Sequence, residues 1–390
     1  MYKVCVLTGT RADYGLLREL LFRLKANREI DLKLIVTGSH LDTKFGNTQQ
    51  EIINDGFTEL TRIHIPLDDD SKKGMAKSTG VALCEFADYF ASEIPDLLVV
   101  LGDRYEVLSA VIAARVQGVP VAHISGGDVT EGAIDDAIRH SVTKMSQLHF
   151  PGCEQSRKRI IQMGEFPDTV YNVGEPGVEN CLKMSLLSRE ELANSISFDI
   201  IHRDYCIVTF HPVTMENNTA EQQVRELVRA MDAYSELGFI VTMANVDAGG
   251  RLINDIWIEE GKKRDNWLIV TSLGVLRYLS AMKYSKAVIG NSSSGIVEAP
   301  SMGVPTVNIG DRQKGRMMAD SVISCLPECG KICEALNTVL DDKYQSLAKN
   351  VFSPFGDGNT SEKIEYHIIN YLKNKSTSGG KSFYDISFEI

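Results

Sequence analysis

The sequence predicts an α/β protein made of two Rossmann-like domains that face a central cleft. Three observations predict this fold class. Short apolar runs alternate with helical patterns along the chain, as in parallel strands joined by helices. Most of the runs are apolar throughout, so their strands are expected to be buried on both faces of a sheet. The alternation breaks once, after Val170–Asn180, and then starts again.

The first domain is expected to span residues 1–175. Each apolar run there is followed by a small or polar loop and then by a segment of helical periodicity. Expected strands lie at Lys3–Thr8, Leu32–Thr37, Asp96–Gly102 and Val119–Ile124, and expected helices at Tyr14–Lys25, near Thr48–Asp55, at Tyr105–Val116 and from Ala133–Asp135 onward.

The second domain is expected to span residues 176–360. The polar stretch Cys181–Arg203 is predicted to be irregular, and the strand pattern then resumes. The remaining residues, 361–390, are expected to form a helix at Ser361–Lys373 and a tail; whether they pack back on the first domain stays open. Expected strands lie at Asp204–Phe210, Gly238–Asn245, Asn266–Thr271, Lys286–Asn291 and Val304–Gly310.

The composition restricts the class of partner. The chain has 390 residues, a net charge of −11 and a pI near 5.3, which argues against binding to nucleic acid or to an anionic membrane. No apolar stretch approaches the roughly 20 residues that span a bilayer. The N-terminal apolar segment is too short for a signal peptide, so a cytoplasmic protein is expected. An anionic ligand would need a local group of arginines.

The cysteines are expected to be reduced and structural. Cys325, Cys329 and Cys333 are each separated by three residues and have no histidine close by, which disfavours a metal site. We therefore expect no metal and no cofactor.

Polar residues follow the predicted strands of the first domain, where open α/β sheets bind ligands. Arg11 lies after the first strand, and Asp13 is predicted to be the N-cap of the following helix. Asp103 and Arg104 follow the strand at Asp96–Gly102. They are interpreted either as an ion pair or as functional residues.

A loop with four acids follows the strand at Val119–Ile124. Taken alone, such a loop is more often solvated than catalytic, and a carboxylate-bound Mg²⁺ is a further alternative. The four acids are Asp128, Glu131, Asp135 and Asp136.

The second domain offers groups that suit a nucleotide. His211 ends a strand before a proline. Ser293, Ser294 and Gly295 open a helix whose free N–H groups suit a diphosphate, and Glu298 follows one turn later, where it can accept hydrogen bonds from a ribose. Positive charge comes from the residues after the next strand, Arg312, Lys314 and Arg316.

Taken together, these motifs resemble the UDP-N-acetylglucosamine 2-epimerase family, in particular its hydrolysing branch in bacterial sialic-acid and capsule synthesis. The resemblance runs in order from GTRADYG through GDRYE and HISGGDVTEGAIDDAIRH to GNSSSGIVEAPSMGVPTVNIGDRQKGR. It implies a glycosyltransferase-B-like fold with UDP in the cleft. It also implies conversion of UDP-N-acetylglucosamine into N-acetylmannosamine and UDP, by elimination to a 2-acetamidoglycal and rehydration.

The resemblance also assigns roles to residues. It implies catalytic roles for Asp103 and Asp135, and a positively charged His211 that assists departure of UDP. Ser125 departs from the family pattern, because many relatives have a glutamate there, and this makes Asp128 and Glu131 the nearest substitutes. Substrate-binding roles are implied for Arg11, Arg104, Ser293, Ser294, Gly295, Glu298 and Arg312.

Three alternatives remain at this point. The first is the same reaction on UDP-2,4-diacetamido-2,4,6-trideoxyglucose, for a legionaminic-acid pathway. The second is a glycosyltransferase on the same fold, and the third is a non-catalytic UDP-sugar sensor. A homo-oligomer, dimer or tetramer, follows from the family alone.

Overall fold

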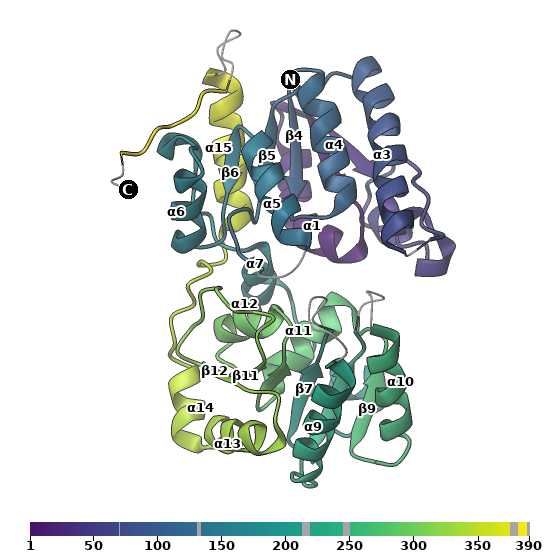
Figure 1. The fold of residues 1–390 in the computed structure, drawn as a ribbon, viewed down its shortest axis with the longest axis vertical. Helices are drawn as coiled ribbons and strands as arrows, with labels where there is room; N and C mark the ends of the chain where they lie inside the picture. The colour runs from purple at the N-terminus through teal and green to yellow at the C-terminus, as the bar shows by residue number, and fades with distance from the viewer. Residues whose placement is uncertain (70, 131–133, 213–218, 245–249, 375–380, 388–390) are drawn as a thin grey trace. The chain divides into compact units, whose positions relative to one another are not determined.

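The computed structural model describes residues 1–69, 71–130, 134–212, 219–244, 250–374 and 381–387 (Figure 1). The described residues form two compact units. The first contains the described residues of Met1–Asp128, of Ile134–Pro176 and of the part from Asn359 onward. The second contains Val129, Thr130 and the described residues of Gly177–Gly358. No helix in the described part of the chain is long and apolar enough to cross a membrane.

The first unit contains a parallel sheet of six strands in the order β3-β2-β1-β4-β5-β6. The central strands β1, β4 and β5 are almost wholly buried, as expected for strands covered on both faces. The strands are β1 (Tyr2–Thr8), β2 (Ile30–Val36), β3 (Leu60–Arg62), β4 (Leu97–Leu101), β5 (Val121–Ile124) and β6 (Leu148–Phe150).

Helices cover both faces of this sheet (Figure 1). The core on one face contains apolar residues of α1 (Arg11–Ala26), α2 (Gln49–Asn54) and α15 (Thr360–Asn374). The core on the other contains those of α3 (Lys72–Ser92), α4 (Tyr105–Val116) and α5 (Ile134–Met145). The unit also has α6 (Glu154–Gln162) and the short 3-10 helices η1 (Gly38–Leu41), η2 (Thr43–Phe45) and η3 (Pro167–Thr169).

The second unit contains a parallel sheet in the order β12-β11-β10-β7-β8-β9. Its strands are β7 (Tyr205–Thr209), β8 (Gly238–Thr242), β9 (Trp267–Val270), β10 (Val288–Gly290), β11 (Thr306–Ile309) and β12 (Val322–Cys325). Two apolar clusters cover its faces. Its helices are α7 (Pro176–Lys183, whose first residue belongs to the first unit), α8 (Arg189–Ile196), α9 (Ala220–Asp232), α10 (Gly250–Gly261), α11 (Gly274–Tyr284), α12 (Ser294–Ser301), α13 (Cys329–Leu340) and α14 (Asp342–Ala348).

The predicted fold class, two α/β halves each built on a parallel sheet, is confirmed. All nine strands predicted from apolar runs are present, with ends that differ by a few residues. The strands β3, β6 and β12 and the long helix α3 were not predicted. Gly74 and Gly80 lie inside α3 and lower its helical propensity, which weakens its signal in the sequence.

Two local predictions are wrong. The N-cap of α1 is Thr10, whose extended backbone lets its hydroxyl accept from the Asp13 N–H at 3.2 Å, so the helix begins three residues earlier than expected. The stretch Cys181–Arg203 is not irregular, because α8 begins there with a capping box. In that box Ser188 Oγ accepts from the Glu191 N–H, and the Glu191 carboxylate accepts from the Ser188 N–H.

The helix α15 completes the core of the first unit although it follows the second unit in the chain. Its buried residues Ile364, Ile368 and Leu372 join the cluster that contains α1. On the surface of this contact, Arg23 of α1 lies 3.1 Å from both Glu362 and Glu365.

Candidate functional site

The strand order of each sheet indicates where a ligand binds. In the first sheet β1 lies between β2 and β4, and in the second β7 lies between β8 and β10. The chain thus leaves its first strand on one side and later returns on the other. Open α/β sheets bind ligands at such a switch point, beyond the carboxyl ends of the strands. The segments after β1, β4, β7 and β10 are therefore candidate binding segments.

A buried carboxylate, Glu106, lies at the switch point of the first sheet. Its Oε1 accepts from Arg104 Nε at 2.5 Å, and a Cβ added to Gly9 would lie 2.7 Å from the same oxygen. Arg104 also acts on the Asp13 carboxyl. Burial raises the pKa of Asp13 to about 6, and the charge of Arg104 opposes that rise. Arg11 is the half-buried first residue of α1. The predicted Arg104 is thus held by a glutamate to which the sequence assigned no role.

A buried arginine of α5, Arg139, gathers the acids that follow β4 and β5. Its side chain is 4% exposed, and its Nη2 donates to the Asp103 carboxylate. Its Nη1 donates to the Asp128 carbonyl at 3.0 Å and lies 3.5 Å from Asp136 Oδ1. His140 Nε2 lies 3.5 Å from Asp136 Oδ2. The guanidinium offsets the repulsion between the Asp103 and Asp136 carboxylates, so both acids can be held at this edge of the sheet.

The other acids predicted for the site are Asp128, Glu131 and Asp135. Asp128 accepts a hydrogen bond from the Ser156 hydroxyl of α6. Asp135 is the exposed second residue of α5, and Glu131 lies outside the described residues. Within the described ranges, no group of three or more His, Cys, Asp or Glu residues is arranged to hold a metal ion.

A further carboxylate, Glu175, reaches the end of β5 from 50 residues away in the chain. Ser125, the residue after β5, donates from its Oγ to Glu175 Oε2 at 2.7 Å. Glu175 lies between Gly174 and Pro176, just before α7, and nothing in that local pattern signals a functional residue. Only the tertiary contact identifies it.

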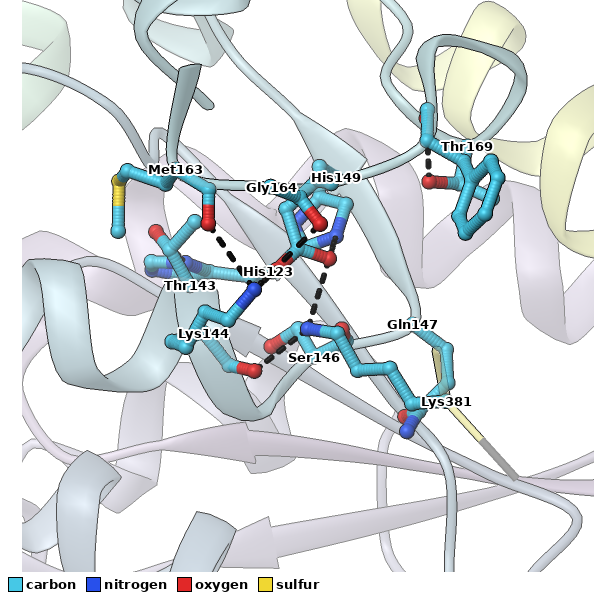
Figure 2. A network of polar contacts seen from close by, with 12 residues as sticks. His123, Thr143, Lys144, Ser146, Gln147, His149, Met163, Gly164, Thr169 and Lys381 are labelled. Carbon is cyan, nitrogen blue, oxygen red and sulfur yellow. Dashed lines mark hydrogen bonds and ion pairs between the residues drawn. The ribbon is translucent and has the colours of Figure 1, made fainter. Parts of the chain in front are cut away.

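A second buried carboxylate, Glu165, connects the end of α5 to the C-terminal tail. It lies 2.8 Å from Lys144 Nζ, 3.0 Å from His149 Nε2 and 2.7 Å from Lys381 Nζ, three side chains that Figure 2 labels. Burial alone would raise the pKa of Glu165, but hydrogen bonds from these three side chains outweigh it and lower that pKa. Lys381 also donates to the carbonyls of Lys144 and Ser146. The tail therefore anchors the helix that carries the acids.

In the second unit, His211 and Asn291 join the ends of β7 and β10. Asn291 Oδ1 accepts from the His211 N–H at 2.7 Å, and its Nδ2 donates to the His211 carbonyl at 2.8 Å. Arg312 Nη1 and Gln313 Nε2 donate to the Asn291 carbonyl at 3.0 and 2.8 Å. Burial, assisted by Arg312, lowers the pKa of His211 to about 3. A pKa lowered in this way favours a neutral imidazole, in contrast to the positive charge expected from the sequence, and leaves Arg312 as the charged group.

The serine segment forms the start of α12. Ser293 is its N-cap, and Ser294 and Gly295 are its first two residues. The hydroxyls of Ser294 and Tyr278 lie 2.6 Å apart. The first N–H groups of a helix lack intrahelical partners, so this end can hold an anion.

Glu298 of α12 is a half-buried carboxylate in the second unit. A Cβ added to Gly177 would lie 2.3 Å from its Oε1, so the start of α7 approaches it closely. Burial raises the pKa of Glu298 from 4.5 to about 7, although Arg316 opposes the rise. The folded unit thus binds a proton here more tightly than the unfolded chain does. The resulting stability is complete below about pH 4.5 and is lost as the pH rises through about 7.

We expect Glu298→Gln to flatten this pH dependence. Both tryptophans, Trp257 and Trp267, belong to the second unit, so urea unfolding followed by tryptophan fluorescence measures that unit. The free energy of unfolding of the wild type should fall, relative to that of the variant, between about pH 5 and pH 7. Glu221→Gln, on the exposed face of α9, should keep the wild-type slope. Equal slopes for wild type and Glu298→Gln would contradict the raised pKa.

Comparisons with known proteins agree with this fold. A family model described as UDP-N-acetylglucosamine 2-epimerase matches residues 23–369. Polysialic acid biosynthesis protein P7 of Escherichia coli is 38% identical over 99% of this chain and 98% of its own length. The hydrolysing UDP-N,N'-diacetylbacillosamine 2-epimerase of Legionella pneumophila is 36% identical over 94% of this chain and 95% of its own.

Among the solved structures of similar fold is UDP-GlcNAc 2-epimerase of Methanocaldococcus jannaschii in complex with UDP-GlcNAc and UDP. It has a TM-score of 0.78 at 20% identity, over 95% of this chain and 99% of that one. The likeness is one of fold, the glycosyltransferase-B-like fold with two parallel six-stranded sheets and flanking helices.

Proposed function

The chain belongs to the UDP-N-acetylglucosamine 2-epimerase family, and from this premise we propose that it is a hydrolysing 2-epimerase. It converts UDP-N-acetylglucosamine into N-acetylmannosamine and UDP, the first step of sialic-acid synthesis. UDP leaves by elimination, which forms a 2-acetamidoglycal, and water then adds to the glycal with inversion at C2.

The acids gathered around Arg139 are the observation that carries this proposal. A C2 proton is a very weak acid, so a base removes it only while the C1–O bond breaks. Inversion then requires a proton to reach C2 from the opposite face, which takes a second acid. The carboxylates of Asp103 and Asp136, together with Asp128 at the same strand edge, supply such groups. The exposed Asp135 begins the same helix and is proposed to act with them.

The second unit is proposed to hold the nucleotide. The start of α12 at Ser293, Ser294 and Gly295 suits the diphosphate, and Arg312 suits its charge. Glu298 is proposed to accept hydrogen bonds from the ribose. The Nδ1 atom of His211 is buried and has no hydrogen-bond partner among the described residues. A neutral imidazole assists the departing diphosphate as a hydrogen-bond donor rather than as a cation.

In the first unit, Arg11 and Arg104 are proposed to contact the substrate. Both lie at the switch point of the first sheet, where Glu106 orients the Arg104 guanidinium. We also propose a homodimer or homotetramer in the cytoplasm, from the family alone; a monomeric mass by light scattering would contradict the assembly.

A second candidate substrate has specific support. The Legionella relative is named for UDP-N,N'-diacetylbacillosamine, which is the 2,4-diacetamido-2,4,6-trideoxy sugar. Its sequence identity to this chain, 36%, is close to the 38% of the polysialic-acid protein. The two sugars differ at C4 and C6, so the chemistry at C1 and C2 is the same for both.

Turnover of both UDP-sugars in D2O tests the proposal. The preferred sugar should release UDP and its 2-epimer with one deuterium at C2, and excess EDTA should leave the rate unchanged. N-acetylmannosamine as the main product selects the first substrate, and faster release of UDP from the diacetamido sugar selects the second. Formation of the UDP-linked epimer without release of UDP would sink the hydrolytic mechanism.

A further inference from the structure

The end of β5 has an unusual backbone at Ser125. This residue has φ of +59°, in the left-handed region that non-glycine residues rarely adopt. Its N–H donates to the Phe150 carbonyl of β6 at 2.9 Å, so the turn is part of the sheet. Such a strained conformation persists where the surrounding structure enforces it, commonly at functional sites. Here the serine hydroxyl reaches the Glu175 carboxylate.

The surroundings of Glu175 leave room for its carboxylate. A Cβ added to Gly152, just after β6, would lie 1.9 Å from Glu175 Oε1, so no other residue fits at that position while the carboxylate is there. The Thr360 hydroxyl at the start of α15 donates to the Glu175 carbonyl at 3.3 Å. The residue is therefore positioned through both its side chain and its backbone.

Glu175 belongs to the same cluster as Asp128. The Cys153 thiol lies 3.3 Å from the Ser156 hydroxyl, which in turn donates to Asp128. Burial raises the pKa of Cys153, and the charges of Asp128 and Glu175 both add to that rise. Gly152, which contacts Glu175, is the chain neighbour of Cys153, so the two acids approach the same short segment after β6 from separate loops.

We propose that Glu175 is a further catalytic residue, the carboxylate that removes the C2 proton of the sugar, with Ser125 as its positioning residue. This inference rests on the proposed function. From the sequence, the substitutes for the glutamate missing at Ser125 were expected in the loop after β5, at Asp128 and Glu131. Glu175 instead arrives from the loop before α7 and accepts a hydrogen bond from the Ser125 hydroxyl.

The proposed step balances as follows. The C2–H bond breaks and the proton moves to Glu175; the electron pair forms the C1–C2 double bond, and the C1–O bond breaks with its pair on UDP. Asp128 takes a proton from solvent and delivers it to the opposite face of C2 while water oxygen adds to C1. The proton that water loses goes to solvent, as does the proton on Glu175, so both carboxylates are regenerated. A single carboxylate cannot serve both faces, which is why two are needed.

The test compares Glu175→Gln, which keeps the side-chain size, with Glu154→Gln on the exposed face of α6. Glu175→Gln should lower the rate of UDP release about 100-fold and leave the Kd for UDP within about twofold of wild type. Added sodium formate should restore activity to Glu175→Ala, because a small carboxylate enters the vacated space, and sodium chloride should not. Glu154→Gln should match the wild type in every assay.

The possible outcomes distinguish the role of Glu175 from the proposed function on which it rests. Turnover of Glu175→Gln within about threefold of wild type overturns the role of Glu175 and leaves the proposed function standing. Failure of the wild type to release UDP from either sugar overturns the proposed function itself. If Glu175→Gln does not fold, Ser125→Ala decides. It should lower kcat about tenfold at unchanged KM, and an unchanged kcat overturns the pair.

Discussion

Asp103→Asn is expected to lower turnover about 1,000-fold while the Kd for UDP stays within about twofold of wild type. Asparagine has the size of aspartate but lacks its negative charge, so the position can neither take a proton nor balance the buried Arg139. The Asp103 carboxylate lies directly after β4 and is 25% exposed, so it can reach a ligand. UDP affinity persists because the proposed diphosphate groups belong to the second unit.

A matched control lies on the same strand. Asp96 precedes β4 at its opposite end and accepts a hydrogen bond from the Lys3 N–H at 2.9 Å. Asp96→Asn should leave turnover within about twofold of wild type. Measurements of kcat, KM and UDP affinity for both variants decide the matter. Equal loss of UDP affinity and turnover in Asp103→Asn would show that the residue binds the nucleotide instead.

Arg139→Met is expected to lower the free energy of unfolding of the first unit by about 3 kcal/mol and turnover by about 100-fold. Methionine fills similar volume but leaves the carboxylates of Asp103 and Asp136 without the guanidinium between them. Their mutual repulsion and partial burial then act without compensation. The released Asp128 carbonyl also loses a donor, which should loosen the loop after β5.

The two units allow this loss to be localised. Far-UV circular dichroism follows both units during urea unfolding, whereas the tryptophans of the second unit should show little change in Arg139→Met. Arg225→Met removes an exposed ion pair on α9 and should cost less than about 0.5 kcal/mol. Arg139→Lys keeps the charge but not the two-pronged geometry, and we expect it to fall between wild type and Arg139→Met. Unchanged stability and turnover in Arg139→Met would refute the central role of this arginine.

The parts of the fold that were predicted are those with a strong local signal. The buried strands β1, β4 and β7 are continuous apolar runs, which arise because helices cover both faces of their sheets. The strands that were missed, β3, β6 and β12, each have three or four residues and lie at sheet edges. An edge strand pairs on one side only, and β3 and β12 are half-exposed, so their hydrophobic pattern is weak.

The candidate site divides in the same way. The sequence predicts Asp103, Arg104, His211 and the serines of α12 as site residues because each lies at or just after the end of a predicted strand. Arg139 was not predicted as a site residue although it lies in the motif HISGGDVTEGAIDDAIRH, because an arginine on a helix usually faces solvent. Its burial depends on α5 packing beside α4, which no local pattern encodes.

Hydrophobic periodicity and the small residues after each apolar run are local properties of the chain, so the residues at the carboxyl ends of the strands can be identified without a structure. Which charged groups come into contact depends on how the strands and helices pack. Glu175 joins Ser125, and Arg312 joins Asn291, because the order of strands in each sheet brings loops together that lie 50 and 21 residues apart. The lowered pKa of His211 also depends on this packing, because burial is its main cause.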